Sequence, residues 1–121
     1  MAEYQEKRGA PRTVLPNHPT AWTHDGLAVR LLDLSLTGAR IEHLDLLPFG
    51  LQGSLELPAA LGFLLISTQV VWCAAIKEER YARGDRRLRA CSGLKFVELT
   101  EYQQTVLERA LKELAAGASP A

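Results

Sequence analysis

The sequence predicts an all-β protein with one C-terminal helix, in which about six short antiparallel strands close into a small β-barrel. Short segments rich in branched and aromatic residues alternate with turn residues over residues 13–99. No helical stretch between these segments is available to carry a parallel crossover, which favours antiparallel pairing. The only strong helical pattern lies at the end of the chain, and closing the sheet leaves no exposed strand edge.

The strands are predicted from short runs that either alternate or are wholly apolar. A first strand is expected over residues 13–22, where Pro16 and Pro19 restrict it to an edge or bulged position. From Leu51 to Leu57, leucines alternate with polar residues, the pattern of a strand with one buried face. After the first strand, the predicted strands are residues 27–35, 38–44, 51–58, 63–74 and 89–99.

A C-terminal helix is predicted over residues 100–116. Thr100 is a suitable N-cap, and Gln103 three residues later completes a capping box. A frayed tail is expected over residues 117–121, which contain glycine and proline. One face of the helix is apolar and is expected to pack on the sheet; it consists of Tyr102, Val106, Leu107, Ala110, Leu111 and Leu114.

The composition is that of one soluble globular domain. The chain has 121 residues, of which 47% are hydrophobic and 23% charged, enough for a single core. The longest apolar run, residues 60–67, is shorter than the roughly 20 residues that a membrane span needs, and the N-terminus has no export signal. A cytoplasmic location without membrane insertion is therefore expected. Cys73 and Cys91 lack metal-ligand spacing, so both are expected to be reduced, half-buried thiols.

Charge is distributed unevenly, although the formal net charge is zero. Residues 77–95 hold seven Lys or Arg against three Asp or Glu. One basic cluster lies ahead of the first strand and comprises Lys7, Arg8 and Arg12. The other is the segment KEERYARGDRRLR at residues 77–89, which is interpreted as a solvated loop because it is rich in charge and interrupted by glycine.

Two polar residues interrupt an otherwise apolar strand. Asp33 and Ser35 are two positions apart, which predicts that they share one face, and Gly38 follows at the turn. One interpretation is structural: Asp and Ser satisfy backbone donors, and Gly38 supplies a positive φ. The other is a binding site. Arginines bind phosphate oxygens or the O6/N7 edge of guanine, and a carboxylate accepts from the N1 and N2 hydrogens of guanine, so a ligand with both groups matches the set.

Two motifs resemble those of the PilZ domain family, bacterial receptors for cyclic di-GMP. The segment RGAPR, from Arg8 to Arg12, resembles the RxxxR motif, and DLSLTG, from Asp33 to Gly38, resembles the (D/N)xSxxG motif. The downstream GLKFVEL, followed by a helix, resembles the closing strand and terminal helix of that family. The resemblance implies a six-stranded antiparallel PilZ-like β-barrel with cyclic di-GMP as its ligand, and neither a metal nor a further cofactor.

The resemblance also implies how the ligand is held. The arginines would grip phosphates and guanine edges as an arm of residues 1–12 folds over the ligand. The carboxylate and hydroxyl would hold a guanine and a phosphate from the surface of the barrel at residues 13–99, with the glycine shaping the turn. The chain would be a stand-alone receptor that relays its signal to an effector protein, with one or two ligand molecules bound. The expected ligand-binding residues are Lys7, Arg8, Arg12, Asp33, Ser35 and Gly38.

Other function classes stay open. A small nucleic-acid-binding barrel would use the basic segments, but zero net charge and only 7% aromatic residues argue against an extended phosphate-binding face. An enzyme is not expected, because His18, His24 and His43 have no carboxylate or cysteine partners at catalytic or metal-binding spacing and are interpreted as solvated. The third alternative is a PilZ-like interaction module that does not bind nucleotide.

Overall fold

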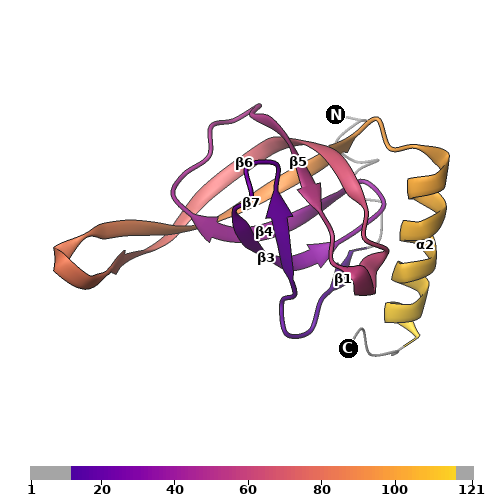
Figure 1. Ribbon diagram of the computed structural model, residues 1–121, viewed down its shortest axis with the longest axis horizontal. Coiled ribbons are helices and arrows are strands. Elements are labelled where there is room, and N and C mark those ends of the chain that lie inside the picture. The colour runs from indigo at the N-terminus through magenta and orange to yellow at the C-terminus, as the bar shows by residue number, and fades with distance from the viewer. Residues whose placement is uncertain (1–11, 117–121) are drawn as a thin grey trace.

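A computed structural model, which describes residues 12–116, shows a closed ring of antiparallel strands with one long helix packed beside it (Figure 1). Six strands are hydrogen-bonded in the order β3-β2-β5-β6-β7-β4, and β4 pairs back with β3. The predicted all-β class, six-stranded antiparallel closure and C-terminal helix are confirmed. The elements are β1 (Thr13–Val14), β2 (Thr20–Thr23), β3 (Ala28–Leu34), β4 (Gly38–Leu44), β5 (Gln52–Glu56), the short 3-10 helix η1 (Ala59–Leu61), β6 (Leu65–Arg80), the 3-10 turn η2 (Ala82–Gly84), β7 (Arg86–Val97) and α2 (Glu101–Ala115).

The expected first strand is in fact two short strands. β1 pairs with the end of β3, whereas β2 pairs with both β3 and β5. Between β1 and β2, Pro16 and Pro19 flank Asn17 and His18, whose φ angles are 64° and 41°. Proline cannot donate to a ladder, and left-handed residues break an extended path. The chain therefore turns between the two strands instead of continuing as one bulged strand.

The core fills the interior of the ring and is aliphatic. Inward-facing residues alternate with more exposed ones, as in β4, where Ala39, Ile41 and His43 are buried. Leu51, the first of the alternating leucines, is 42% exposed because it precedes β5 and lies outside the ring ladder. The large apolar side chains that are almost fully buried are Leu15, Leu31, Leu34, Ile41, Leu55, Leu57, Leu61, Ile66 and Leu107.

The C-terminal helix begins as predicted, but its buried face is narrower. Thr100 Oγ1 accepts from the Gln103 amide at 3.1 Å, and Gln103 Oε1 accepts from the Thr100 amide at 3.1 Å, which confirms the capping box. Tyr102 is 72% exposed, not buried, because the helical period places it well to the side of the stripe centred on Leu107. α2 packs on η1 and β1. Within residues 12–116, no helix has the length and apolar character needed to cross a membrane.

The segment at residues 77–89 is not the loop that its charge predicts. β6 and β7 continue through it as a two-stranded hairpin that projects from the ring (Figure 1). Opposite charges at diagonal positions of the two strands stabilise the extended backbone, although Lys77 is directly opposite Arg89 and Arg80 is opposite Arg86. Arg83 and Gly84, both at positive φ, make the turn. The ion pairs between the two strands are Glu78–Arg86 (3.4 Å) and Glu79–Arg89 (3.0 Å), whereas Lys77–Glu79 (3.8 Å) lies within β6. Two more join the hairpin to β4 and the segment after it: Arg89–Glu42 (3.8 Å) and Arg87–Asp45 (Nε to Oδ1, 3.0 Å).

Cys73 and Cys91 are free thiols of intermediate burial, as expected. Cys73 is opposite Ser92 in the β6–β7 ladder, and Cys91 is opposite Ala74. Adjacent positions of a strand face opposite sides of the sheet, so the two thiols point away from each other and cannot form a disulfide. Burial raises the pKa of the Cys91 thiol above its usual value, although the charge of Arg40 acts in the opposite direction.

Candidate functional site

Asp33 faces outward because a β-bulge interrupts β3. The β3–β4 register places Leu31 opposite Ile41 and then Asp33 opposite Arg40, so Leu32 is an extra residue in β3. In a regular strand without the bulge, Asp33 would be two positions after Leu31 and would share its inward face, where Leu31 is completely buried. Bulges re-aim side chains in this way. Here the bulge turns the carboxylate toward the outer face of the ring, next to Arg40.

Two arginines converge on the Asp33 carboxylate. Arg40 Nε lies 3.1 Å from Asp33 Oδ2, and Arg12 Nη1 lies 3.9 Å from the same oxygen. Asp33 is only 4% exposed, whereas the side chains of Arg12 and Arg40 are 60% and 41% exposed. Arg40 Nε is buried, and within residues 12–116 it donates no well-aligned hydrogen bond. The structure therefore brings together the last arginine of RGAPR and the aspartate of DLSLTG, with guanidinium groups exposed above a buried carboxylate.

The Ser35 hydroxyl organises the turn between β3 and β4. The Ser35 amide donates to Gly38 O at 2.9 Å, while Ser35 Oγ accepts from the amides of Thr37 at 3.1 Å and Gly38 at 3.2 Å. These two bonds use both acceptor positions of the hydroxyl. The hydroxyl proton of Ser35 can be donated to Thr37 Oγ1, which lies 3.1 Å from Ser35 Oγ. The structural interpretation of Ser35 is thus supported, and a single O–H donor remains for a ligand.

Gly38 is needed because β7 passes close to it, and the expected positive φ is wrong. Its φ lies outside the left-handed region. A Cβ atom at this position would overlap the carbonyl oxygen of Leu94, a main-chain atom of β7 that has no room to move aside. The turn is held against β7 by a hydrogen bond from the Phe96 amide to Thr37 O at 2.8 Å. The glycine therefore fixes the position of the turn that contains Ser35.

An indole ring lies in the same row as the arginine–aspartate pair. Gly93 of β7 is opposite Arg40 on one side and opposite Trp72 of β6 on the other. A Cβ atom on Gly93 would lie 2.6 Å from Trp72 Cε2 and 2.7 Å from Cδ1, so the ring lies directly across the glycine. Trp72 is 38% exposed. The outer face of β3, β4, β7 and β6 thus presents a carboxylate, two guanidinium groups and an aromatic ring.

Sequence reasoning missed Arg40 and Trp72. Arg40 could have been found, because it alternates with the buried Ala39 and Ile41 and so must face outward beside β3. Trp72 could not, because a second bulge, at Val71 in β6, sets the register that brings it opposite Gly93. The local pattern of branched residues in the sequence does not indicate that bulge.

The remaining expected site residues include two that lie outside the described residues, Lys7 and Arg8. His43 is not solvated as expected: it is 5% exposed, and its Nε2 lies 2.7 Å from Ser92 Oγ inside the ring. No cluster of three or more His, Cys, Asp or Glu side chains suited to a metal occurs in the described part of the chain. The described candidate site thus consists of Arg12, Asp33, Ser35, Gly38 and Arg40, with Trp72 beside it.

Comparison with solved structures finds proteins that share this fold. The PilZ domain of YcgR from Escherichia coli, in a structure with c-di-GMP, aligns with a TM-score of 0.62 and 17% identity over 89% of this chain and 91% of that chain. MrkH, described as a c-di-GMP-dependent transcription regulatory factor, aligns with a TM-score of 0.63 and 17% identity over 90% of this chain and 51% of its own chain. MrkH in the K. pneumonia MrkH–c-di-GMP complex aligns with a TM-score of 0.65 and 16% identity over 89% of this chain and 52% of its own chain.

At these identities the solved structures show a shared fold, and this chain spans about half the length of MrkH. No curated protein sequence matches the chain significantly. The PilZ domain family itself matches residues 6–113, a range that includes both RGAPR and DLSLTG. This chain belongs to the PilZ domain family.

Proposed function

We propose that this chain is a receptor for the second messenger cyclic di-GMP, which binds on the outer face of β3, β4, β7 and β6. The observation that carries the proposal is the convergence of Arg12 and Arg40 on Asp33, at 3.9 Å and 3.1 Å, beside the exposed ring of Trp72. The structures of YcgR and MrkH with c-di-GMP support the identity of the ligand.

Each group on this face has a complementary group on the ligand. The Asp33 carboxylate accepts from the N1 and N2 hydrogens of a guanine, which no other common base offers together. The guanidinium groups of Arg12 and Arg40 bind phosphate oxygens bidentately, and the Ser35 hydroxyl donates its one proton. The Trp72 ring gives a purine a stacking surface, typically worth about 1–3 kcal/mol per base.

In this proposal, signalling depends on the N-terminal segment. Residues 1–12 supply Lys7 and Arg8 in addition to Arg12 and close over the bound nucleotide, at a cost of roughly 1–2 kcal/mol for each residue that becomes ordered. An effector protein that recognises only the closed arm gains affinity in proportion to its preference for that state. The functional units are then the arm at residues 1–12, the ring at 13–99, the helix at 100–116 and the tail at 117–121, in a cytoplasmic receptor without enzymatic activity.

A second candidate function is an interaction module that does not bind nucleotide. The observation in its favour is that Asp33 is 4% exposed and already paired, and that the acceptor positions of Ser35 are already used. If these groups serve only the fold, the surface is complete without a ligand. Nucleotide titration separates the two functions.

The test is calorimetric titration with cyclic di-GMP and, as a matched ligand, cyclic di-AMP. The two share the phosphate backbone, but adenine has an acceptor at N1 where guanine has a donor, so the Asp33 carboxylate repels it. We expect cyclic di-AMP to bind at least about tenfold more weakly, the equivalent of one lost charge-assisted hydrogen bond. Failure of the folded protein to bind either nucleotide would establish the second candidate, and equal binding of both would remove Asp33 from base recognition.

A further inference from the structure

The aromatic residues lie almost entirely outside the core. Of the seven aromatic residues within residues 12–116, only Phe96 is packed against the core, and the other six are exposed. Aromatic side chains carry the largest apolar surface and are enriched at protein interfaces. Trp72 is accounted for by the nucleotide-binding face. The rest are Trp22 (39% exposed), Phe49 (81%), Phe63 (68%), Tyr81 (42%) and Tyr102 (72%).

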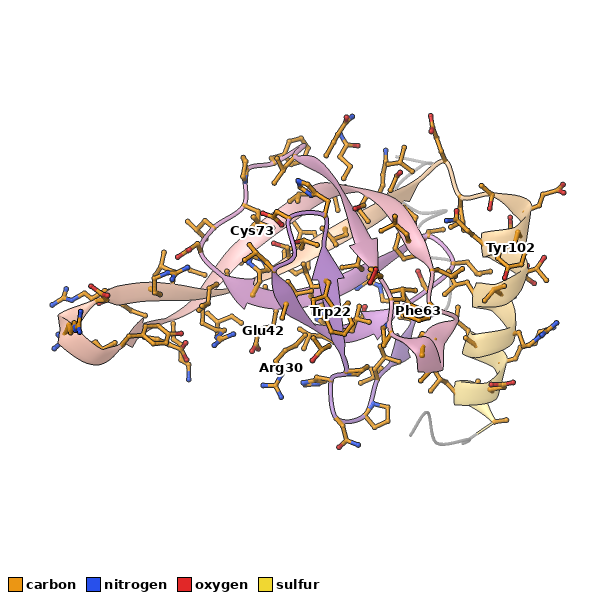
Figure 2. All side chains as sticks on the ribbon, viewed as in Figure 1. Trp22, Arg30, Glu42, Phe63, Cys73 and Tyr102 are labelled. Atoms are coloured by element: carbon orange, nitrogen blue, oxygen red, sulfur yellow. The ribbon has the colours of Figure 1, made fainter. Side chains whose placement is uncertain are left out.

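Four exposed apolar side chains lie in succession from β2, past the turn after η1 and the start of β6, to the first turn of α2 (Figure 2), and we call this surface the aromatic patch: Trp22, Phe63, Leu65 and Tyr102. Glu56 of β5 is opposite Trp22 on one side and opposite Leu65 on the other, so both apolar residues face outward in one row. Gln103 Nε2 donates to Leu65 O at 2.7 Å, which ties the first turn of α2 to the start of β6. In Figure 2, Trp22, Phe63 and Tyr102 all lie away from the projecting hairpin.

Phe63 is held outward in a conformation that phenylalanine rarely adopts. Its φ is 58°, and it follows Gly62 at 93°. A Cβ atom on Gly62 would overlap Val106 Cγ1 of α2, so the helix fixes the turn. Leu61 and Leu64, on either side, are 1% and 5% exposed and anchor the chain in the core. A left-handed backbone strains a bulky residue, and exposure of the ring gives no packing in return, as is typical of residues retained for function.

The aromatic patch has an acidic border. The segments that build it, residues 20–29, 51–70 and 98–106, contain no lysine or arginine. Glu98 and Glu101 are exposed along these segments. The nearest basic residues on the same elements lie beyond these segments: Arg30 is opposite Thr20 of β2, and Arg109 and Lys112 are in the second half of α2. A negatively charged surface attracts cationic partners and repels anionic ones, including nucleotides and nucleic acid.

We propose that the aromatic patch is a docking surface for a partner protein, and that the segment bound there carries apolar side chains flanked by lysine or arginine. The exposed rings serve as anchors that lose water on docking, and the surrounding carboxylates select the cationic flanks. Among residues 12–116, the ion pairs of Arg12, Asp33 and Arg40 involve no patch residue, and in this proposal docking is independent of nucleotide binding.

The test uses a random twelve-residue peptide display library panned against the full chain. We expect the enriched peptides to combine aromatic or aliphatic residues with lysine or arginine. Their affinity should fall about tenfold or more for Phe63→Asn, which removes an anchor ring. Asparagine accepts a left-handed φ, so this variant should melt no lower than the parent protein. The matched control is Phe49→Asn, which removes an exposed ring outside the patch and should leave affinity within about twofold.

Two further measurements locate the bound peptide. The indole N–H resonance of Trp22 should shift on peptide addition while that of Trp72 stays in place. Glu101→Gln should weaken binding about threefold at low salt and less at high salt, because exposed charges are screened. Enrichment of acidic peptides, absence of any enrichment, or peptides indifferent to Phe63→Asn would each overturn the proposal. A dimer in sedimentation that Phe63→Asn converts to a monomer would also overturn it, because a second copy would then cover the patch.

Discussion

Replacing Arg40 with alanine removes the cation nearest to a buried carboxylate. Asp33, 4% exposed, would be left with Arg12 Nη1 at 3.9 Å as its only nearby cation within residues 12–116. A charged hydrogen-bonding group left unpaired costs about 1–3 kcal/mol, but Arg40 is 41% exposed, so water that enters its place reduces the cost. We expect Arg40→Ala to lower the free energy of unfolding by about 1–2 kcal/mol, or roughly 4–8 °C in melting temperature for a domain of this size.

The assay is a double-mutant cycle in urea denaturation, with Arg40→Ala and Asp33→Ala alone and combined. When Asp33 is already absent, loss of Arg40 should cost less than about 0.5 kcal/mol, because no buried charge remains to be uncovered. Arg30→Ala is the matched control, since Arg30 also faces outward from β3, opposite Glu42, and its loss should stay within about 0.5 kcal/mol.

The same Arg40 variant also tests the ligand site. Calorimetry should show cyclic di-GMP binding weakened by about 1.5–3 kcal/mol, roughly 10- to 100-fold, because a charge-assisted contact to the nucleotide is lost. Arg40→Lys should recover stability better than affinity, since an ammonium keeps the charge but not the bidentate geometry. If Arg40→Ala melted at the parental temperature and bound the nucleotide normally, the ion pair would contribute to neither fold nor function, and the reasoning from its geometry would be refuted.

Three further outcomes are expected. Gly38→Ala should lower the melting temperature and abolish nucleotide binding together, because the added Cβ overlaps the main chain of β7; wild-type binding in a folded variant would show that the turn can shift freely. Arg12→Ala should weaken nucleotide binding by about 1.5–3 kcal/mol without changing the melting temperature, since Arg12 is 60% exposed and packs in no core. The hydrogen bond from Arg87 lowers the pKa of Asp45 below its usual 3.8, so this pair stabilises the hairpin above about pH 4 and is lost as the pH falls through the lowered pKa. The NMR resonance of the Arg87 Nε–H group, which donates to Asp45, should move over that range in the parent protein and move much less in Asp45→Asn.

Local patterns in the sequence predict most of the ring, because alternation and turn residues are local properties. They fail at residues 77–89, where local charge indicates a loop. The stabilising pairs there, such as Glu79 with Arg89, join residues ten positions apart and exist only once the strands have paired. The prediction that Tyr102 packs on the sheet was wrong for a related reason. Its position in the helix is clear from the sequence, but the width of the buried stripe depends on how α2 packs on η1 and β1.

The candidate site was predicted in part, and one step of the prediction was wrong. The order of the two motifs predicts that Arg12 and Asp33 meet, and they do, at 3.9 Å. The two-residue spacing of Asp33 and Ser35, however, does not explain the orientation of the carboxylate. The bulge at Leu32 does, and no local signal distinguishes Leu32 from the leucines on either side of it. Single-residue insertions in a ladder depend on pairing, so the sequence predicts which residues form the site better than it predicts their orientation.

The two proposed surfaces share only β6, and they occupy different parts of it. Leu65 of the aromatic patch and Trp72 of the nucleotide-binding face are seven residues apart, about 20 Å along an extended strand. That distance exceeds the Debye length of roughly 8–10 Å at physiological ionic strength, so the charge on one surface is largely screened from a ligand on the other. An anionic nucleotide is drawn to the arginine-rich face, whereas a cationic partner segment is repelled there and attracted to the acidic border of the patch. Opposite local charge thus allows one small ring to hold both ligands without competition, and any coupling between them has to pass through the packed interior or the N-terminal segment.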